Sequence, residues 1–63
     1  MKLMTDKRYV LYYNGFFDEY NVREVQSFNR VFGDRTELNI IPILYTNSED
    51  IAFNVKNKLN KEL

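Results

Sequence analysis

The side chains that could do acid–base chemistry in this sequence are carboxylates, and four of them form two adjacent pairs, Asp18-Glu19 and Glu49-Asp50. Adjacent acids can bind Mg²⁺ or Ca²⁺, or divide acid and base roles between them. Each pair also has a structural interpretation. Glu49-Asp50 opens an expected helix, where negative charge is stabilising, and Asp18-Glu19 lies beside an expected turn. We favour the structural roles and predict no metal site and no catalytic residue.

Other groups that commonly do chemistry are scarce. The 63 residues contain no His and no Cys, which removes the commonest general base, the thiolate nucleophile and the usual zinc ligands. The two serines, Ser27 and Ser48, have no His to activate them. The two glycines fit turn and cap positions, and neither a Rossmann nor a P-loop pattern occurs. We therefore expect a protein that is not an enzyme and needs no cofactor.

The charges give little reason to expect a nucleic-acid or membrane partner. Nine basic residues balance nine acidic ones, so no net field attracts an anionic polymer or surface. A nucleic-acid-binding domain remains the alternative hypothesis, with exposed tyrosines stacking on bases near three C-terminal lysines, Lys56, Lys58 and Lys61. The same lysines suit the negative end of a helix, and we rank this hypothesis second.

Aromatic and aliphatic side chains support a protein-interaction hypothesis instead. Five Tyr and five Phe make up 16% of the chain, and each aromatic side chain can bury roughly 150–250 Å². The competing explanation is that they fill a dense core. We favour an interface, and therefore predict a small non-enzymatic interaction module, a homodimer that regulates or inhibits a larger protein. The expected contact residues are Tyr12, Phe17, Ile41, Ile43, Tyr45 and Phe53.

The N-terminal residues and the absence of Cys indicate the compartment. Residues 1–6 lack the apolar segment of a signal peptide. No apolar run approaches the roughly 20 residues that span a bilayer. Because a chain without Cys fits a reducing compartment, we expect a cytoplasmic protein with no membrane partner.

A β-hairpin is the first expected element. Residues 8–13 are rich in β-branched and aromatic side chains, which suit a strand. Asn14-Gly15 indicates a two-residue type I′ turn, which needs positive φ at both positions. A second strand over residues 16–20 would then place Tyr13 opposite Phe16. A rival interpretation extends one long strand directly into the next helix.

A helix is expected over residues 22–32, with Asn21 and Glu24 forming a capping box. Gly33 is expected to end it in the left-handed conformation. Its apolar stripe comprises Val22, Val25, Phe28, Val31 and Phe32.

A strand over residues 37–45 and a helix over residues 49–61 complete the expected fold. Pro42 indicates an edge position or a bulge in that strand. Asn47 or Ser48 caps the helix, whose apolar stripe comprises Ile51, Ala52, Val55 and Leu59.

The sequence thus predicts a single domain of 63 residues in the α+β class. A small sheet of two or three strands, a hairpin plus one strand, packs against two helices in the order ββαβα, or βαβα under the rival interpretation. We expect both helices on one face of the sheet, so that the other face is left for a partner.

Overall fold

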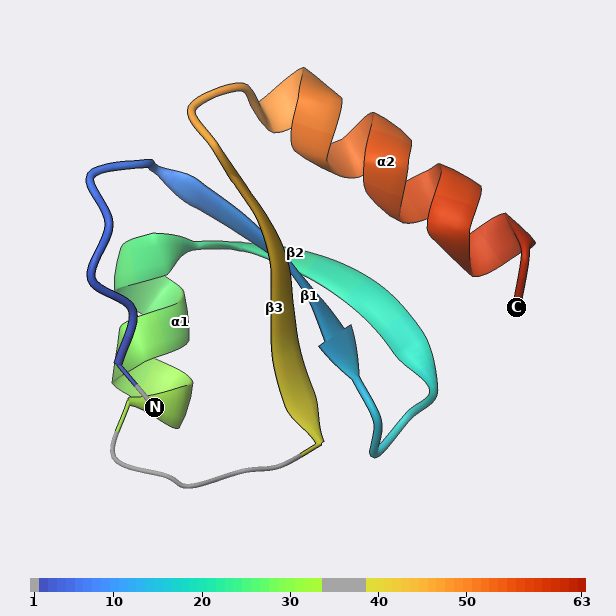
Figure 1. The fold of residues 1–63 in the computed structure, drawn as a ribbon, viewed down its shortest axis with the longest axis horizontal. Coiled ribbons are helices and arrows are strands. Elements are labelled where there is room, and N and C mark those ends of the chain that lie inside the picture. The colour runs from blue at the N-terminus through green and yellow to red at the C-terminus, as the bar shows by residue number, and fades with distance from the viewer. Residues whose placement is uncertain (1, 34–38) are drawn as a thin grey trace.

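The structure, a computed structural model, describes residues 2–33 and 39–63. The elements follow one another as β1 (Tyr9–Asn14), β2 (Glu19–Glu24), α1 (Val25–Phe32), β3 (Ile40–Thr46) and α2 (Glu49–Lys61) (Figure 1). The predicted order ββαβα and the α+β class are confirmed. Within the described residues, neither helix has the length and apolar character needed to cross a bilayer.

The three strands form one antiparallel sheet in the order β2-β1-β3. The central strand β1 is buried at every residue except Tyr13, because it has a neighbour on each side and a helix over each face. Pro42 lies in the edge strand β3, which also carries an irregularity opposite Leu11 and Tyr12. The edge position and the bulge that Pro42 predicted are therefore both present.

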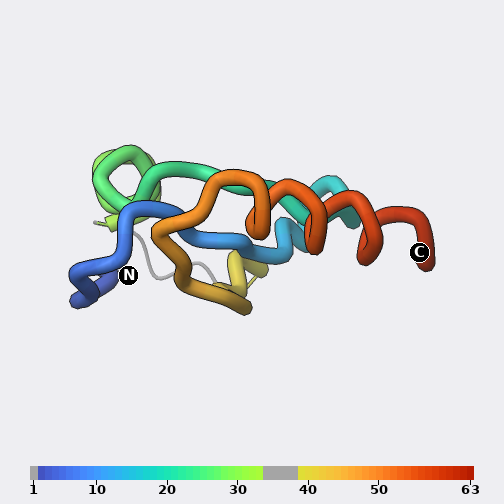
Figure 2. Tube along the Cα trace, turned by 90° about the horizontal axis from the view of Figure 1, so that it is seen from above, coloured from blue at the N-terminus to red at the C-terminus, as the bar shows by residue number. Residues whose placement is uncertain are grey.

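The two helices cover opposite faces of the sheet, so our expectation of two helices on one face is wrong. Figure 1 shows the strands lying between α1 and α2, and Figure 2 shows the two helices toward opposite ends of the molecule. β2 and β3 are parallel to each other, since both are antiparallel to β1. The connection β2-α1-β3 is therefore a crossover that places α1 on one face. The helix that follows β3 takes the other face.

The core lies mainly between α1 and the sheet. Phe28 is fully buried against Val10 and Tyr12 of β1. The Tyr12 and Phe28 rings meet edge to face, with centroids 5.2 Å apart. On the opposite face, Ala52 of α2 is buried, and the hydroxyl of Tyr9 donates a hydrogen bond to Glu49.

The hairpin is present, but its loop is longer than the two residues predicted. Tyr13 pairs with Tyr20 and not with Phe16, and the loop spans residues 15–18. Asn14 explains the difference, because its backbone oxygen and its side-chain Oδ1 accept from the N–H groups of Phe17 and Phe16. This Asx-type turn moves the positive φ from Asn14-Gly15 to Asp18, at 52°.

The first helix is shorter than predicted. Residues 21–24 continue β2, where all four pair with β1, and α1 begins at Val25. The predicted capping box is therefore wrong: Asn21 donates to Glu19, and the N-cap Glu24 makes no side-chain capping bond. Gly33 has right-handed φ and ψ angles, so the predicted left-handed cap is also wrong.

The later elements agree better with prediction. α2 has the predicted bounds, and its N-cap Ser48 accepts a 3.2 Å hydrogen bond from Ile51 N–H. Ile51 itself is half-exposed and does not belong to the buried stripe. β3 begins at Ile40, and the predicted strand residues 37–38 lie outside the described part of the chain.

Candidate functional site

The outer strand β3 exposes three large apolar side chains, those of Ile41, Ile43 and Tyr45, which we call the β3 surface. Their exposed fractions are 47%, 50% and 40%. Ile41 pairs with Tyr13 and Tyr45 pairs with Val10, so these two side chains lie on different faces of the sheet. The β3 surface therefore follows the edge of the sheet on both faces.

The opposite edge of the sheet is covered. The side chain of Asn60 in α2 accepts a 2.7 Å hydrogen bond from the backbone N–H of Tyr20 in β2 and donates a 3.0 Å bond to its C=O. A side-chain amide thus pairs with β2 as a neighbouring strand would. No comparable side-chain pair reaches β3 from the described residues. The two edges therefore differ, and β3 is the open one.

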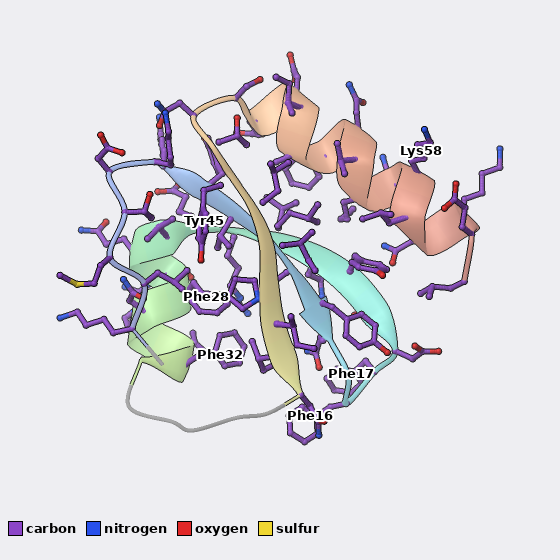
Figure 3. The ribbon with its side chains drawn as sticks, in the orientation of Figure 1. Phe16, Phe17, Phe28, Phe32, Tyr45 and Lys58 are labelled. Atoms are coloured by element: carbon purple, nitrogen blue, oxygen red, sulfur yellow. The ribbon has the colours of Figure 1, made fainter. Side chains whose placement is uncertain are left out.

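Five of the six predicted contact residues are exposed, but they are not all neighbours. Ile41, Ile43 and Tyr45 share β3, whereas Phe17, 74% exposed, lies in the hairpin loop, away from Tyr45 (Figure 3). Phe53 lies on α2, with the Lys56 ammonium 4.9 Å from its ring centre. Tyr12 is only 2% exposed. Its selection as a surface contact is wrong, because it occupies the central strand under α1.

The three lysines of the nucleic-acid hypothesis do not form one basic face. Lys56 and Lys58 are two positions apart on α2 and so face different sides of the helix. Figure 3 shows Lys58 pointing away from the sheet. Lys58 lies on the α2 side of the sheet, whereas Phe28 and Phe32 lie on the α1 side. Lys56 and Lys58 therefore do not lie side by side on α2.

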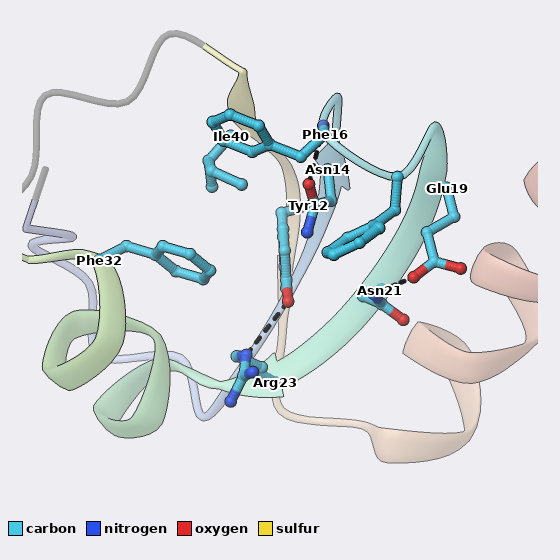
Figure 4. A pocket seen from close by; sticks show the side chains of 9 residues that line it. Tyr12, Asn14, Phe16, Glu19, Asn21, Arg23, Phe32 and Ile40 are labelled. Carbon is cyan, nitrogen blue, oxygen red and sulfur yellow. Dashed lines mark hydrogen bonds between the residues drawn. The ribbon is translucent and has the colours of Figure 1, made fainter.

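A cavity of about 510 Å³ opens on the α1 face of the sheet (Figure 4). α1 has eight residues and is roughly 12 Å long, whereas the six residues of β1 extend roughly 20 Å. The helix therefore covers Val10 and Tyr12 but leaves the far half of this face open. Three aromatic side chains at the cavity, besides Tyr12, come from the hairpin loop and from α1: Phe16, Phe17 and Phe32.

Polar side chains from two neighbouring strands also line this cavity. The cavity is lined by alternate residues of β2, namely Glu19, Asn21 and Arg23. In the sheet they pair with Asn14, Tyr12 and Val10 of β1, in that order. The Arg23 guanidinium donates from Nε to the Tyr12 hydroxyl at 3.1 Å and from Nη1 to Ser27 Oγ at 3.1 Å. Asn21 Nδ2 donates to Glu19 Oε1.

Two of the four carboxylates considered for catalysis accept hydrogen bonds from tyrosine hydroxyls. Asp18 Oδ1 accepts from the Tyr13 hydroxyl at 2.5 Å, and Glu49 Oε2 accepts from the Tyr9 hydroxyl at 3.0 Å. These bonds to the carboxylates, with burial, raise the pKa of each tyrosine above its ordinary value. Within residues 2–33 and 39–63, no three metal-ligating side chains gather into a cluster.

The cavity was not predicted, because residues 22–24 were expected to be helical with Asn21 as the N-cap. Assigned to a strand, Glu19, Asn21 and Arg23 alternate along one face, and this spacing is the signal that would have revealed a polar row beside Phe16 and Phe17. Comparisons with protein families, curated proteins and solved structures find no match to this chain.

Proposed function

We propose that this protein is a small protein-interaction module, not an enzyme, which forms a homodimer through the β3 surface. In this proposal the dimer works in the cytoplasm as a regulator or inhibitor of a larger protein. The observation that carries the proposal is the half-exposed apolar row of Ile41, Ile43 and Tyr45 along the open edge of the sheet.

Exposed apolar side chains cost solvation free energy of roughly 25 cal/mol for each Å² that a partner would remove from water. In β3 they follow one another at alternate positions, and they are not scattered singly over the surface. Aromatic and aliphatic side chains in such a group mark interaction surfaces.

A second copy is the partner that we favour, because an edge strand can meet its own symmetry mate about a two-fold axis. Pro42 lies in the middle of β3 and has no N–H to donate. Continuous backbone pairing between two β3 strands would therefore be interrupted there. We expect the contact to be made chiefly by the side chains of Ile41, Ile43 and Tyr45.

The isoleucine methyl groups of the unmodified protein offer a direct test, read by NMR as the concentration is raised to the millimolar range. The chain has four isoleucines. We expect the methyl signals of Ile41 and Ile43 to shift with concentration, while those of buried Ile40 and of Ile51 on α2 stay unchanged. Signals that move equally at all four positions, or at none, would contradict the proposal.

A further inference from the structure

We propose that the cavity on the α1 face binds a planar, uncharged heteroaromatic ring of the nucleobase type. This site is separate from the β3 surface, and the inference does not rest on the proposed homodimer. It rests on an unpaired side-chain amide donor of a mostly buried asparagine at the cavity, on the mixture of donors and acceptors around it, and on the aromatic rings that flank them.

The donor is the side-chain amide of Asn14. This residue is only 8% exposed, and its Oδ1 is used by the N–H of Phe16 at 3.0 Å. Its Nδ2 donates to no acceptor among the described residues, although Asn14 lines the cavity (Figure 4). None of the described side-chain N or O atoms is fully enclosed without a hydrogen-bond partner, so the unpaired Asn14 NH₂ group is open to water in the cavity. A ligand acceptor placed there would take the place of that water.

Further hydrogen-bonding groups of both kinds line the same cavity. Arg23 uses Nε and Nη1 within the protein, which leaves Nη2 as a donor. Asn21 uses Nδ2 on Glu19, which leaves its Oδ1 as an acceptor. A hydrocarbon ring would desolvate these groups without pairing them, whereas the edge of a nucleobase carries both donors and acceptors.

The aromatic side chains suit the faces of such a ring. Phe16 and Phe17 lie in the hairpin loop and Phe32 near the end of α1, all lining the cavity. Stacking between a base and an aromatic side chain contributes substantially to affinity and tolerates any base. Arg23 and Glu19 carry opposite charges, so the lining has no net charge that would select an anion. The volume of about 510 Å³ is in the range of small-molecule sites.

The test is an NMR titration with four ribonucleosides, adenosine, guanosine, cytidine and uridine, and with N-acetylphenylalanine amide as the comparison aromatic compound. We expect a nucleoside to shift the Asn14 side-chain NH₂ signals and the backbone signals of Phe17 and Asn21. Binding of the phenylalanine amide alone would overturn the ligand class. No shift of these signals with any of the five compounds at millimolar concentration would overturn the site.

The Asn14→Asp variant removes the NH₂ donor but preserves the turn, because aspartate keeps an Oδ1 acceptor for the Phe16 N–H. We expect nucleoside affinity to fall roughly tenfold. The matched control is Asn47→Asp. Asn47 also accepts a backbone bond through Oδ1, from Arg8 N–H at 2.9 Å, and does not line the cavity. Equal affinities in the two variants would overturn the role of Asn14.

Phe17→Leu tests the same site without changing a buried group, since Phe17 is 74% exposed. We expect a roughly fivefold or greater loss of nucleoside affinity from the missing ring. Phe53→Leu is its control, because Phe53 lies on α2, over the other face of the sheet. If Phe17→Leu and Phe53→Leu both bind nucleosides as tightly as the unmodified protein, Phe17 does not stack on the ligand and this part of the proposal fails. This test does not depend on whether the Asn14→Asp variant folds.

Discussion

At the scale of single residues, asparagine side chains replace missing backbone partners. Asn60 pairs with both polar groups of Tyr20, and Asn29 in α1 pairs in the same way with the N–H and C=O of Leu3, at 2.7 and 3.1 Å. A side-chain amide carries one acceptor and one donor group, as a backbone residue does. Such pairs fix segments of a 63-residue chain that has no disulfide to do so.

The bond from Tyr9 to Glu49 predicts a dependence of stability on alkaline pH. This bond, with burial, raises the pKa of Tyr9 in the folded protein above the value of about 10 that it has in the unfolded chain. Folded protein therefore retains the proton at a pH where unfolded protein has lost it. The resulting stabilisation is complete below pH of about 10, and it is lost as pH rises through the folded pKa.

Urea unfolding of the unmodified protein and of Tyr9→Phe across this alkaline range measures the effect. We expect the free energy of unfolding of the unmodified protein to fall more steeply, because the variant lacks this ionisable group. The raised pKa of Tyr13 contributes to both proteins and cancels in the difference. Parallel curves would show that the Tyr9 hydroxyl is not coupled to Glu49 in solution.

At the scale of elements, the pairing of α2 with β2 predicts a large effect of a small substitution. In Asn60→Asp, a carboxylate replaces the NH₂ group that donates to Tyr20 C=O at 3.0 Å. We expect the free energy of unfolding to fall by about 1–3 kcal/mol, because a partly buried carbonyl loses its donor and faces negative charge. Urea denaturation monitored by circular dichroism measures the change.

Asn57→Asp is the matched control on the same helix. Asn57 is exposed and its side chain makes no hydrogen bond to the described residues, so the substitution adds the same charge near the C-terminus of α2 without removing a side-chain bond. We expect a loss of about 0.5 kcal/mol or less. Equal losses in the two variants would assign the effect to the helix dipole and not to the bond with Tyr20.

Elements with strong local signals could be predicted from the sequence. The bounds of α2 could be predicted from the N-cap Ser48, the acidic residues of the first turn and the lysines of the last turn. The β1 strand follows from its β-branched and aromatic residues. Residues 22–24 were predicted as helix with Asn21 as its N-cap, because Asn21 and Glu24 fit a capping box, whereas the pairing of these residues with β1 is a long-range contact with no local signal.

At the scale of the whole molecule, the sequence could not show which faces the helices cover. Two amphipathic helices and three strands are compatible with both helices on one face or one helix on each. The strand order β2-β1-β3 makes α1 a crossover on one face, and α2 packs on the other face. The surplus apolar surface is consequently an edge, β3, and not a bare face as predicted.

This arrangement also explains why the candidate sites were only partly predictable. Ile41, Ile43 and Tyr45 could be selected from their types alone, because they belong to the most apolar run of the chain. Their exposure depends on β3 being the outer strand. The cavity depends on the short length of α1, which the predicted helix of residues 22–32 would have concealed.

The central claim, that the β3 surface mediates self-association, is tested most directly by sedimentation velocity on a matched pair of variants. Ile43→Lys and Ile51→Lys make the same change at residues that are 50% and 52% exposed, on β3 and α2 respectively. We predict that the unmodified protein and Ile51→Lys sediment as dimers at high concentration, whereas Ile43→Lys remains a folded monomer. Equal sedimentation of all three proteins would contradict the account.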